Sequence, residues 1–399
     1  MSADTHQPDT ARDLLVQNLI DSGDLHTPEI QAAVRAVPRH LFLPEVPVAD
    51  AYADQIVVTK RDADGVALSS ASQPSIVVRM LEQAQPQPGW RVLEIGAGTG
   101  YNAALLRELV GDAGQVTTID IYDDVVDEAR HNLAAAGYGD IHILQRDGAL
   151  GAPERAPFDL IVVTAGAWDI PAAWWAQLAP NARVVVPLRW RGLTRSLALR
   201  HRPAATDQPT ALIAESMHLC GFIPMIGASD GEHTITLADD VTLLSDQDQN
   251  FGDLHGVLDT PRTEVWSGVV IPGDQSMEGI WLRMSTAEPG TCRIKATPTA
   301  VSTGLVTPAT PVNPALAERE SIAYLTTRRA IEGASRWEIG AIGHGPRGED
   351  LAERIVAQIH RWAAAPDAVP DVALYRISVH APAVGLTVAK RDSIMIISW

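Results

Sequence analysis

The sequence predicts an α/β fold with a doubly wound, mostly parallel sheet that has an antiparallel edge, followed by an α+β region rich in strands. Two observations support this prediction. Between residues 91 and 187, short β-branched runs alternate with amphipathic stretches, which is typical of a parallel sheet covered by helices on both faces. After about Gly227, proline, threonine and glycine become frequent and helical periodicity largely disappears.

The N-terminal part is expected to form helices around an irregular segment. Apolar residues form a stripe within residues 10–37, where Thr27 and Pro28 are typical of the start of a second helix. Residues 39–58 are rich in proline and aromatic side chains, which indicates irregular structure covering a core. A further helix is predicted from about Pro74 to Ala84.

The alternating region predicts a series of strands and helices. Strands are expected at Arg91–Ile95, Gln115–Ile119, Ile141–Leu144, Leu160–Val163 and Val184–Pro187, and helices at Asn102–Val110, Asp123–Ala136 and Pro171–Leu178. The stretches TRSLALRHR and ALIAESMHLCGFIPM then predict an antiparallel pair that closes the sheet.

The C-terminal part is expected to be mostly β-structure. Gly279–Ser285 is a strand candidate, Asp350–Ala363 has the apolar face of a helix, and ALYRISVH and DSIMIISW are predicted as final strands. We therefore expect an N-terminal cap of helical and irregular structure (1–72), a core (73–227) and a C-terminal α+β extension (228–399).

Composition excludes several classes of function. A net charge of -18 disfavours DNA or RNA as a substrate, because phosphate binding needs a basic surface. The two cysteines, Cys220 and Cys292, argue against a disulfide scaffold and against a metal site. The chain contains no apolar run of membrane-spanning length, and its acidic start is unlike a secretory signal. We therefore expect a cytoplasmic protein with no membrane partner, and the sequence leaves its oligomeric state open.

The stretch LEIGAGTG places closely spaced glycines between a predicted strand and a predicted helix. Such a pattern can be an ordinary strand-to-helix turn, or it can let a ligand approach the backbone. Here Glu94 stands two residues before Gly96. A carboxylate would repel the pyrophosphate of a dinucleotide, whereas it attracts the ammonium and sulfonium of S-adenosyl-L-methionine. This cofactor is therefore the predicted ligand.

Two further acids follow the next predicted strands. Asp120 ends the second strand, where a carboxylate can accept hydrogen bonds from ribose hydroxyls. Asp147, in RDG, follows the third strand and is positioned to accept from an adenine amino group. The predicted cofactor-binding residues are Ser72, Glu94, Gly96, Ala97, Gly98, Gly100, Tyr101, Asn102, Asp120, Ile121, Asp147, Gly148 and Thr164.

From about Arg39 to Gly227 the chain resembles the protein-L-isoaspartate O-methyltransferase family. The resemblance rests on SQPSIVVRMLE, VLEIGAGTGYNAALL, RDG, APFDLIVVTAGAWDIP and FIPMIG, in this order. It implies a Rossmann-like class I methyltransferase fold, with Ser72 and Gln73 as catalytic residues beside the transferable methyl group. Ser72 is expected to orient the carboxylate or the cofactor, although Ser72-Gln73-Pro74 is also a pattern for capping a helix.

The chain departs from the family's repair enzyme in ways that bear on the substrate. The segment Tyr52-Ala53-Asp54-Gln55-Ile56 lacks the proline of the family's pattern, and we assign Tyr52, Gln55 and Ile56 to the substrate side. The repair enzyme is expected to end near Gly227. The longer chain resembles a branch encoded with actinobacterial ribosomal-peptide pathways, which carries a C-terminal domain ending in a segment like KRDSIMIISW.

This branch implies a modified precursor peptide as substrate partner, either a lanthipeptide or an ATP-grasp-cyclised peptide. Methylation of one aspartate side chain would be followed by closure of the ester to an aspartimide. His344 and Arg347, in GHGPRG, are candidates for binding a peptide carboxylate, or they are solvated loop residues. Two alternatives remain at this point: general isoaspartate repair, and a non-catalytic binding module that has kept the cofactor pocket.

Overall fold

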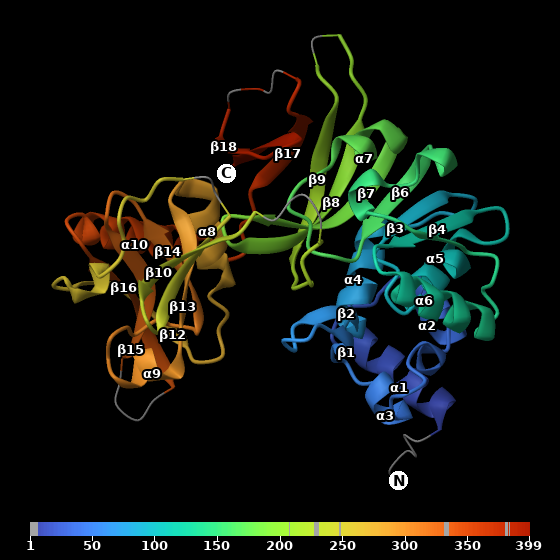
Figure 1. The fold of residues 1–399 in the computed structure, drawn as a ribbon, viewed down its shortest axis with the longest axis horizontal. Coiled ribbons are helices and arrows are strands. Elements are labelled where there is room, and N and C mark those ends of the chain that lie inside the picture. Colours follow the sequence, from blue (N-terminus) through green and yellow to red (C-terminus); the bar gives the residue numbers. More distant parts are fainter. Residues whose placement is uncertain are drawn as a thin grey trace.

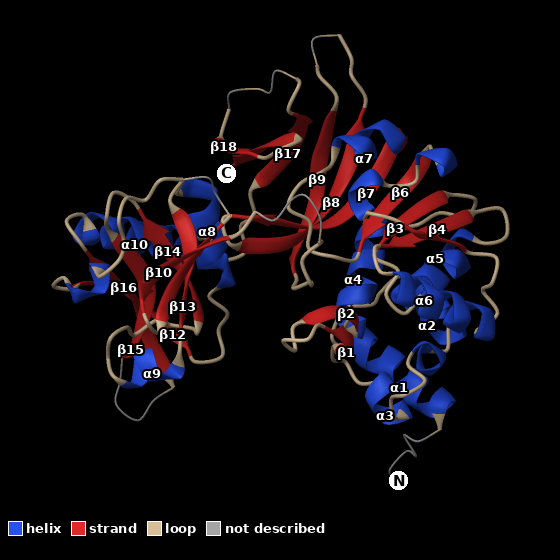
Figure 2. Ribbon diagram, in the orientation of Figure 1, coloured by secondary structure: helices blue, strands red, loops and turns tan. Residues whose placement is uncertain are grey.

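The computed structural model describes residues 7–206, 208–226, 231–246, 249–330, 335–379, 382 and 384–399. In these ranges the chain forms two lobes, seen side by side in Figure 1. A ten-stranded sheet organises the first lobe and a seven-stranded sheet the second, and a two-stranded hairpin belongs to the first lobe (Figure 2).

The ten-stranded sheet runs in the order β18-β19-β17-β9-β8-β7-β6-β3-β4-β5. Strands β3 to β7 pair in parallel and the remaining pairs are antiparallel, which confirms the predicted sheet and its antiparallel edge. The strands are β3 (Arg91–Ile95), β4 (Gln115–Asp120), β5 (His142–Gln145), β6 (Phe158–Val163), β7 (Leu178–Trp190), β8 (Leu193–Arg202), β9 (Ala211–Leu219), β17 (Asp371–Arg376), β18 (Leu386–Ala389) and β19 (Ser393–Ser398).

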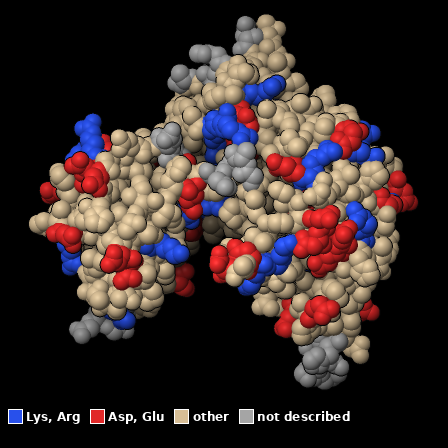
Figure 3. All heavy atoms as spheres, viewed as in Figure 1, with Lys and Arg blue, Asp and Glu red and all other residues tan. Residues whose placement is uncertain are grey.

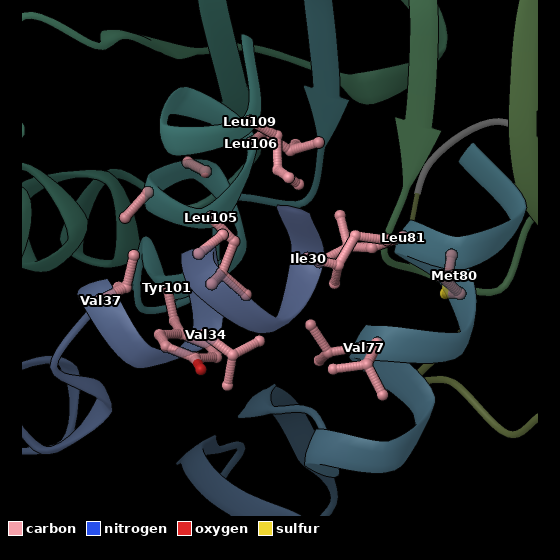
Figure 4. Packing of buried hydrophobic residues seen from close by; sticks show 14 of the residues in the cluster. Ile30, Val34, Val37, Val77, Met80, Leu81, Tyr101, Leu105, Leu106 and Leu109 are labelled. Carbon is pink, nitrogen blue, oxygen red and sulfur yellow. The ribbon is translucent and has the colours of Figure 1, made fainter. Parts of the chain in front are cut away.

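Helices cover both faces of this sheet. They are α1 (Pro8–Asp21), α2 (Pro28–Ala36), α3 (Val48–Ala51), α4 (Pro74–Ala84), α5 (Tyr101–Val110), α6 (Asp123–Ala135) and α7 (Ala172–Gln177), with short 3-10 turns η1 (Arg39–Phe42), η2 (Gly148–Leu150) and η3 (Pro153–Arg155). Figure 4 shows how Ile30, Val77 and Leu105 bring α2, α4 and α5 into one core. On the opposite face α7 buries Trp174 and Trp175.

The segment predicted to be irregular contains more regular structure than expected. It includes α3, and it leads into a hairpin of β1 (Val57–Arg61) and β2 (Ala67–Ala71). The turn residues 62–66 are closed by Asp62, whose carboxylate accepts hydrogen bonds from the backbone N–H groups of Asp64 and Val66. The charged residues of this turn interrupt the apolar pattern, so the strands on either side of it were not predicted.

The second sheet is antiparallel, in the order β10-β11-β13-β14-β15-β16-β12. Its elements are β10 (His233–Ala238), β11 (Val241–Ser245), η4 (Val257–Asp259), β12 (Thr263–Pro272), α8 (Glu278–Ala287), β13 (Thr291–Ala296), α9 (Pro298–Ser302), β14 (Val312–Ala317), β15 (Ile322–Arg329), β16 (Arg336–His344) and α10 (Gly348–Ala364). The predicted helix near 350–363 is thus confirmed. The strand predicted at Gly279–Ser285 is wrong, because Ile280 and Met284 pack as neighbours on one face of a helix.

The chain returns from the second lobe to the first. Strand β17 pairs with β9, and β19 and β18 follow it, so residues 371–376, 386–389 and 393–398 belong to the first sheet. The expected extension 228–399 therefore contributes to both sheets, and its boundary at 227 and 228 lies outside the described residues. Pairing with β17 covers the backbone of β9, which would otherwise be an edge strand.

The two lobes are also joined by the β7–β8 hairpin, which is longer than predicted. At its turn Arg191 donates a hydrogen bond to the carbonyl of Ser285 in α8 (3.2 Å). Acidic side chains lie close to basic ones across the face shown in Figure 3, in keeping with the ion pairs between surface arginines and carboxylates. Within the described ranges, no helix is both long and apolar enough to cross a membrane.

Candidate functional site

A cavity of about 810 Å³ opens at the carboxyl ends of β3, β4 and β6. This is the edge of a doubly wound sheet where ligands are generally bound. Its walls come from the glycine turn after β3, the end of β4, the loop after β6, the hairpin β1–β2, the start of α4 and the segment 219–226. The predicted site residues that line it are Ile56, Ser72, Gln73, Glu94, Gly96, Ala97, Gly98, Tyr101, Asn102, Asp120, Ile121, Gly148 and Thr164.

The glycines of this turn allow both close packing of neighbouring segments and the approach of a ligand. Gly96 has a φ of 102°, and a Cβ atom there would lie 2.5 Å from the Oγ1 atom of Thr164. Thr164 Oγ1 donates a hydrogen bond to the Gly96 carbonyl (2.6 Å), so the loop after β6 sits directly against the turn. A Cβ atom on Gly100 would lie 2.9 Å from Leu133. At Gly98, by contrast, the nearest atom to a Cβ is 3.6 Å away, so the open approach is there.

Glu94 is a fully buried acid at the base of the cavity. Its carboxylate accepts hydrogen bonds from Asn102 Nδ2 (2.7 Å) and Thr118 Oγ1 (2.6 Å). Burial raises the pKa of Glu94 to about 7, against the opposing effect of these two donors. A cation bound in the cavity would compensate this desolvated charge, and the ammonium of S-adenosyl-L-methionine fits that requirement.

Asp120 lies at the end of β4 and faces the same cavity. Its two carboxylate oxygens accept hydrogen bonds from the backbone N–H groups of Gly98 (3.2 Å) and Tyr122 (3.3 Å). Because each carboxylate oxygen has two acceptor positions, both can still accept a bond from a ligand hydroxyl. This arrangement fits the ribose of the predicted cofactor beside the open face of Gly98.

Asp147 is placed differently from the prediction. Its Oδ1 atom accepts the N–H of Ala149 (2.9 Å) and so caps the short turn η2, and Asp147 is not among the residues that line the cavity. Its neighbour Gly148 does line the cavity. Trp174 donates from Nε1 to the Gly148 carbonyl (2.9 Å), which fixes this part of the wall.

Ser72 and Gln73 lie at the other side of the cavity, at the start of α4. Gln73, rather than Ser72, occupies the N-cap position, and Asp54 supports the helix start by accepting the N–H of Ser75 (2.8 Å). Gln73 Nε2 donates to the second oxygen of Asp54 (2.9 Å). Within the described part of the chain Ser72 Oγ has no hydrogen-bond partner, so the hydroxyl can contact a ligand.

Arg39 is a cavity residue that the sequence did not reveal as functional. Its side chain is buried, and it donates from Nε to the Ala51 carbonyl (2.8 Å) and from Nη2 to the Ser72 carbonyl (2.9 Å). The guanidinium also lies 4.8 Å from the centre of the Tyr101 ring. Burial lowers the pKa of Arg39 from its usual value. This position could not be predicted from the sequence, because Arg39 follows Pro38 in a stretch without periodicity.

The remaining predicted substrate residues are not brought together. Tyr52 is buried and shares a hydrogen bond with His40 Nδ1 (3.0 Å), Gln55 is exposed, and Ile56 is exposed at the cavity mouth. His344 and Arg347 lie in the second lobe and do not line the cavity.

Both second-lobe residues have structural partners. His344 is buried with its ring stacked on Tyr324, and burial lowers its pKa. Arg347 forms ion pairs with Glu318 and Asp350 (2.6 Å each). His344 ends β16 and Arg347 precedes α10, so both belong to the second lobe and neither lines the candidate site.

Tyr122 and the segment Phe222–Ile226 also line the cavity, although neither was predicted as part of the site. The segment lies beside the loop after β6, where Gly166 bonds to Ile223 and Met225. The motif FIPMIG was the available signal, and its last residue, Gly227, lies outside the described residues.

Comparison with known proteins agrees with this geometry. The sequence model of the family Protein-L-isoaspartate(D-aspartate) O-methyltransferase (PCMT) matches residues 10–229, more than half of the chain. The chain is 36% identical over 219 residues to the protein-L-isoaspartate O-methyltransferase of Methanopyrus kandleri, covering 54% of this chain and 92% of that protein. It is 38% identical over 215 residues to the corresponding protein of Rhodopseudomonas palustris, with coverage of 54% and 92%.

One solved structure extends the likeness in fold beyond residue 227. A protein-L-isoaspartate O-methyltransferase aligns over 97% of this chain and 99% of its own, with a TM-score of 0.51 and 21% identity. The Methanopyrus and Rhodopseudomonas proteins align over 92% of their length within 54% of this chain, as expected of proteins that end near Gly227, whereas this solved structure aligns through the C-terminal lobe as well. This chain belongs to the protein-L-isoaspartate (D-aspartate) O-methyltransferase family, and S-adenosyl-L-methionine is its methyl donor.

Proposed function

We propose that this chain methylates the free carboxylate of isoaspartyl residues in peptides and proteins. The observation that carries the proposal is the placement of Ser72, with its unpartnered hydroxyl, in the same cavity as Glu94 and Asp120, in a chain of this family. Relatives that align over about nine-tenths of their length are named for this activity.

The proposed reaction needs no general base from the protein. When bound, S-adenosyl-L-methionine supplies an electrophilic methyl group. The accepting carboxylate is already ionised at neutral pH, because its ordinary pKa is about 4. The rate therefore depends on bringing the carboxylate into line with the methyl group and on excluding water from it.

Residues on one side of the cavity bind the cofactor, and residues on the other side orient the acceptor. On the cofactor side, Glu94 attracts an ammonium group and Asp120 accepts from hydroxyls. On the acceptor side, Ser72 Oγ donates a hydrogen bond that orients the carboxylate. Arg39 holds the Ser72 backbone in place through its carbonyl, which keeps this hydroxyl directed at one position.

The test compares matched peptides by mass spectrometry. An isoaspartyl peptide and the same sequence with a normal aspartate are incubated with the protein and cofactor. We expect the isoaspartyl peptide alone to gain one methyl group, and Ser72→Ala to lower its kcat about tenfold or more with little change in cofactor affinity. A wild-type protein that leaves isoaspartyl peptides unchanged would contradict the proposal.

A second candidate is methylation of one aspartate in a cyclised ribosomal peptide, with closure of the ester to an aspartimide. The feature that favours it is the second sheet, whose strands all lie outside the residues matched by the family model. In this candidate residues 228–399 recognise the modified peptide; the partly exposed Arg347 can take part, but the buried His344 cannot. It predicts methylation of a normal aspartate in the cyclised precursor, followed by loss of methanol, and no turnover of unrelated isoaspartyl peptides.

A further inference from the structure

We propose that the C-terminal segment 390–393 clamps the loop after β6 (residues 164–170), so that Asp169, Lys390 and Ser393 are positioning residues for the methyl-acceptor side of the cavity. The contacts between these two segments form the clamp. The kinetic consequence rests on the proposed function, but the clamp itself concerns only the structure of this chain.

The clamp is a set of hydrogen bonds between segments more than two hundred residues apart. The buried carboxylate of Asp169 accepts bonds from the backbone N–H of Asp392 (2.6 Å) and from Ser393 Oγ. Lys390 Nζ donates to the carbonyls of Trp168 (2.7 Å) and Arg189 (2.6 Å). The loop is therefore bonded to the C-terminal segment through the Asp169 carboxylate and through the Trp168 backbone carbonyl.

The clamped loop is continuous with the cavity wall. Thr164, at its start, lines the cavity and bonds to the glycine turn. Two residues on, the N–H of Gly166 donates to Ile223 (2.8 Å), and its carbonyl accepts from Met225 (2.9 Å). The loop thus carries one wall of the cavity and fixes the segment that forms the next one.

Arg189 of β7 also contacts the loop, and it is itself paired with an acid that follows the first lobe in sequence. Arg189 stacks over the Trp168 ring at 4.2 Å, and its guanidinium lies 3.6 Å from the carboxylate of Glu232. Its N–H also donates to the carbonyl of Ala167 (2.9 Å). The loop is therefore held by β7 and by the clamp, in both cases through groups that are costly to leave unpaired when buried.

The clamp should affect the acceptor more than the cofactor. Glu94 is held by Asn102 and Thr118, and the N–H of Gly96 donates to the Ile119 carbonyl (2.8 Å). These three bonds do not involve the clamped loop. The loop does contact the glycine turn through Thr164, but this residue lies at the opposite end of the loop from Asp169, and its N–H donates to the Ile95 carbonyl of β3 (2.9 Å). The wall at 222–226, which we assign to the acceptor side, is by contrast bonded to the clamped loop itself through Gly166. A loosened clamp would displace the accepting carboxylate while the donor stays in place.

The test uses Ser393→Ala and Asp169→Asn in the full chain, with Asp159→Asn as matched control. Asp159 also accepts a backbone N–H, that of Arg91 (2.9 Å), but lies at the opposite end of β6 from the cavity. We expect kcat/KM for an isoaspartyl peptide to fall about tenfold or more in the clamp variants, while the cofactor Kd stays within about twofold. The control variant should retain the wild-type kcat/KM per folded molecule.

Hydrogen–deuterium exchange provides a readout that needs no substrate. We expect faster exchange in residues 164–170 and 222–226 of the clamp variants and unchanged exchange in these segments of the control. Unchanged kinetics together with unchanged exchange in Ser393→Ala, the milder variant, would overturn the inference even if Asp169→Asn failed to fold. Wild-type protein that is inactive on isoaspartyl peptides would instead contradict the proposed function, and the exchange data would still decide the clamp.

Discussion

Replacing Glu94 with glutamine removes a charge that the cofactor-free protein holds at a high cost. The carboxyl is fully buried, which raises its pKa from 4.5 to about 7. Between these two values the folded state keeps a proton that the unfolded state has lost, so stability falls as pH rises through this range. With about 1.4 kcal/mol for each pKa unit, the ionised group costs about 3 kcal/mol at pH 8.

Glu94→Gln should therefore be more stable than the wild type without cofactor, and the difference should depend on pH. We expect it to grow from about 1 kcal/mol at pH 5 to about 3 kcal/mol at pH 8, measured by urea unfolding at each pH. Glu154→Gln is the control, because Arg146 lowers the pKa of that exposed carboxyl instead of raising it. A stability difference for Glu94→Gln that does not change with pH would refute the reasoning.

Cofactor binding should show the opposite effect of the same substitution. The ionised form of Glu94 attracts the ammonium, so wild-type affinity should rise about tenfold per pH unit up to about 7 and then level off. Glu94→Gln should bind about a hundredfold more weakly at pH 8 and lose this pH dependence. Calorimetric titration across pH measures both, and an unchanged pH profile in the variant would place the titrating group elsewhere.

Other substitutions test the remaining walls of the cavity. Gly96→Ala places a Cβ atom 2.5 Å from Thr164 Oγ1 at a positive φ, and we expect it to abolish measurable cofactor binding in calorimetry while circular dichroism shows a folded protein. Lys60→Met removes the ion pair between the hairpin and Asp124, and should speed cofactor release about fivefold in stopped-flow measurements, less so at high salt. Arg39→Met leaves buried carbonyls unpaired and should lower the free energy of unfolding by about 2–4 kcal/mol in denaturant titrations; a loss below about 0.5 kcal/mol would contradict the assigned contacts.

The cofactor side of the site was largely predictable from the sequence because it depends on local pattern. Glu94 and Asp120 end neighbouring parallel strands, and such strands bring their carboxyl ends to one edge of the sheet. The alternation of strands and helices was likewise predictable, because hydrophobic periodicity is a local property of the sequence. Asp147 is an exception: its place after the third strand was predicted correctly, but its side chain caps the turn η2.

Contacts between distant segments were decided only by the tertiary structure. Arg39 reaches the Ser72 carbonyl, and Asp169 meets Ser393, because buried polar groups must find partners wherever the fold brings two segments together. No local periodicity encodes such pairs. The sequence by itself determined the parallel core and the acids at its carboxyl edge; the return of the last strands to the first sheet, and their bonds to the loop after β6, were determined by long-range pairing and burial.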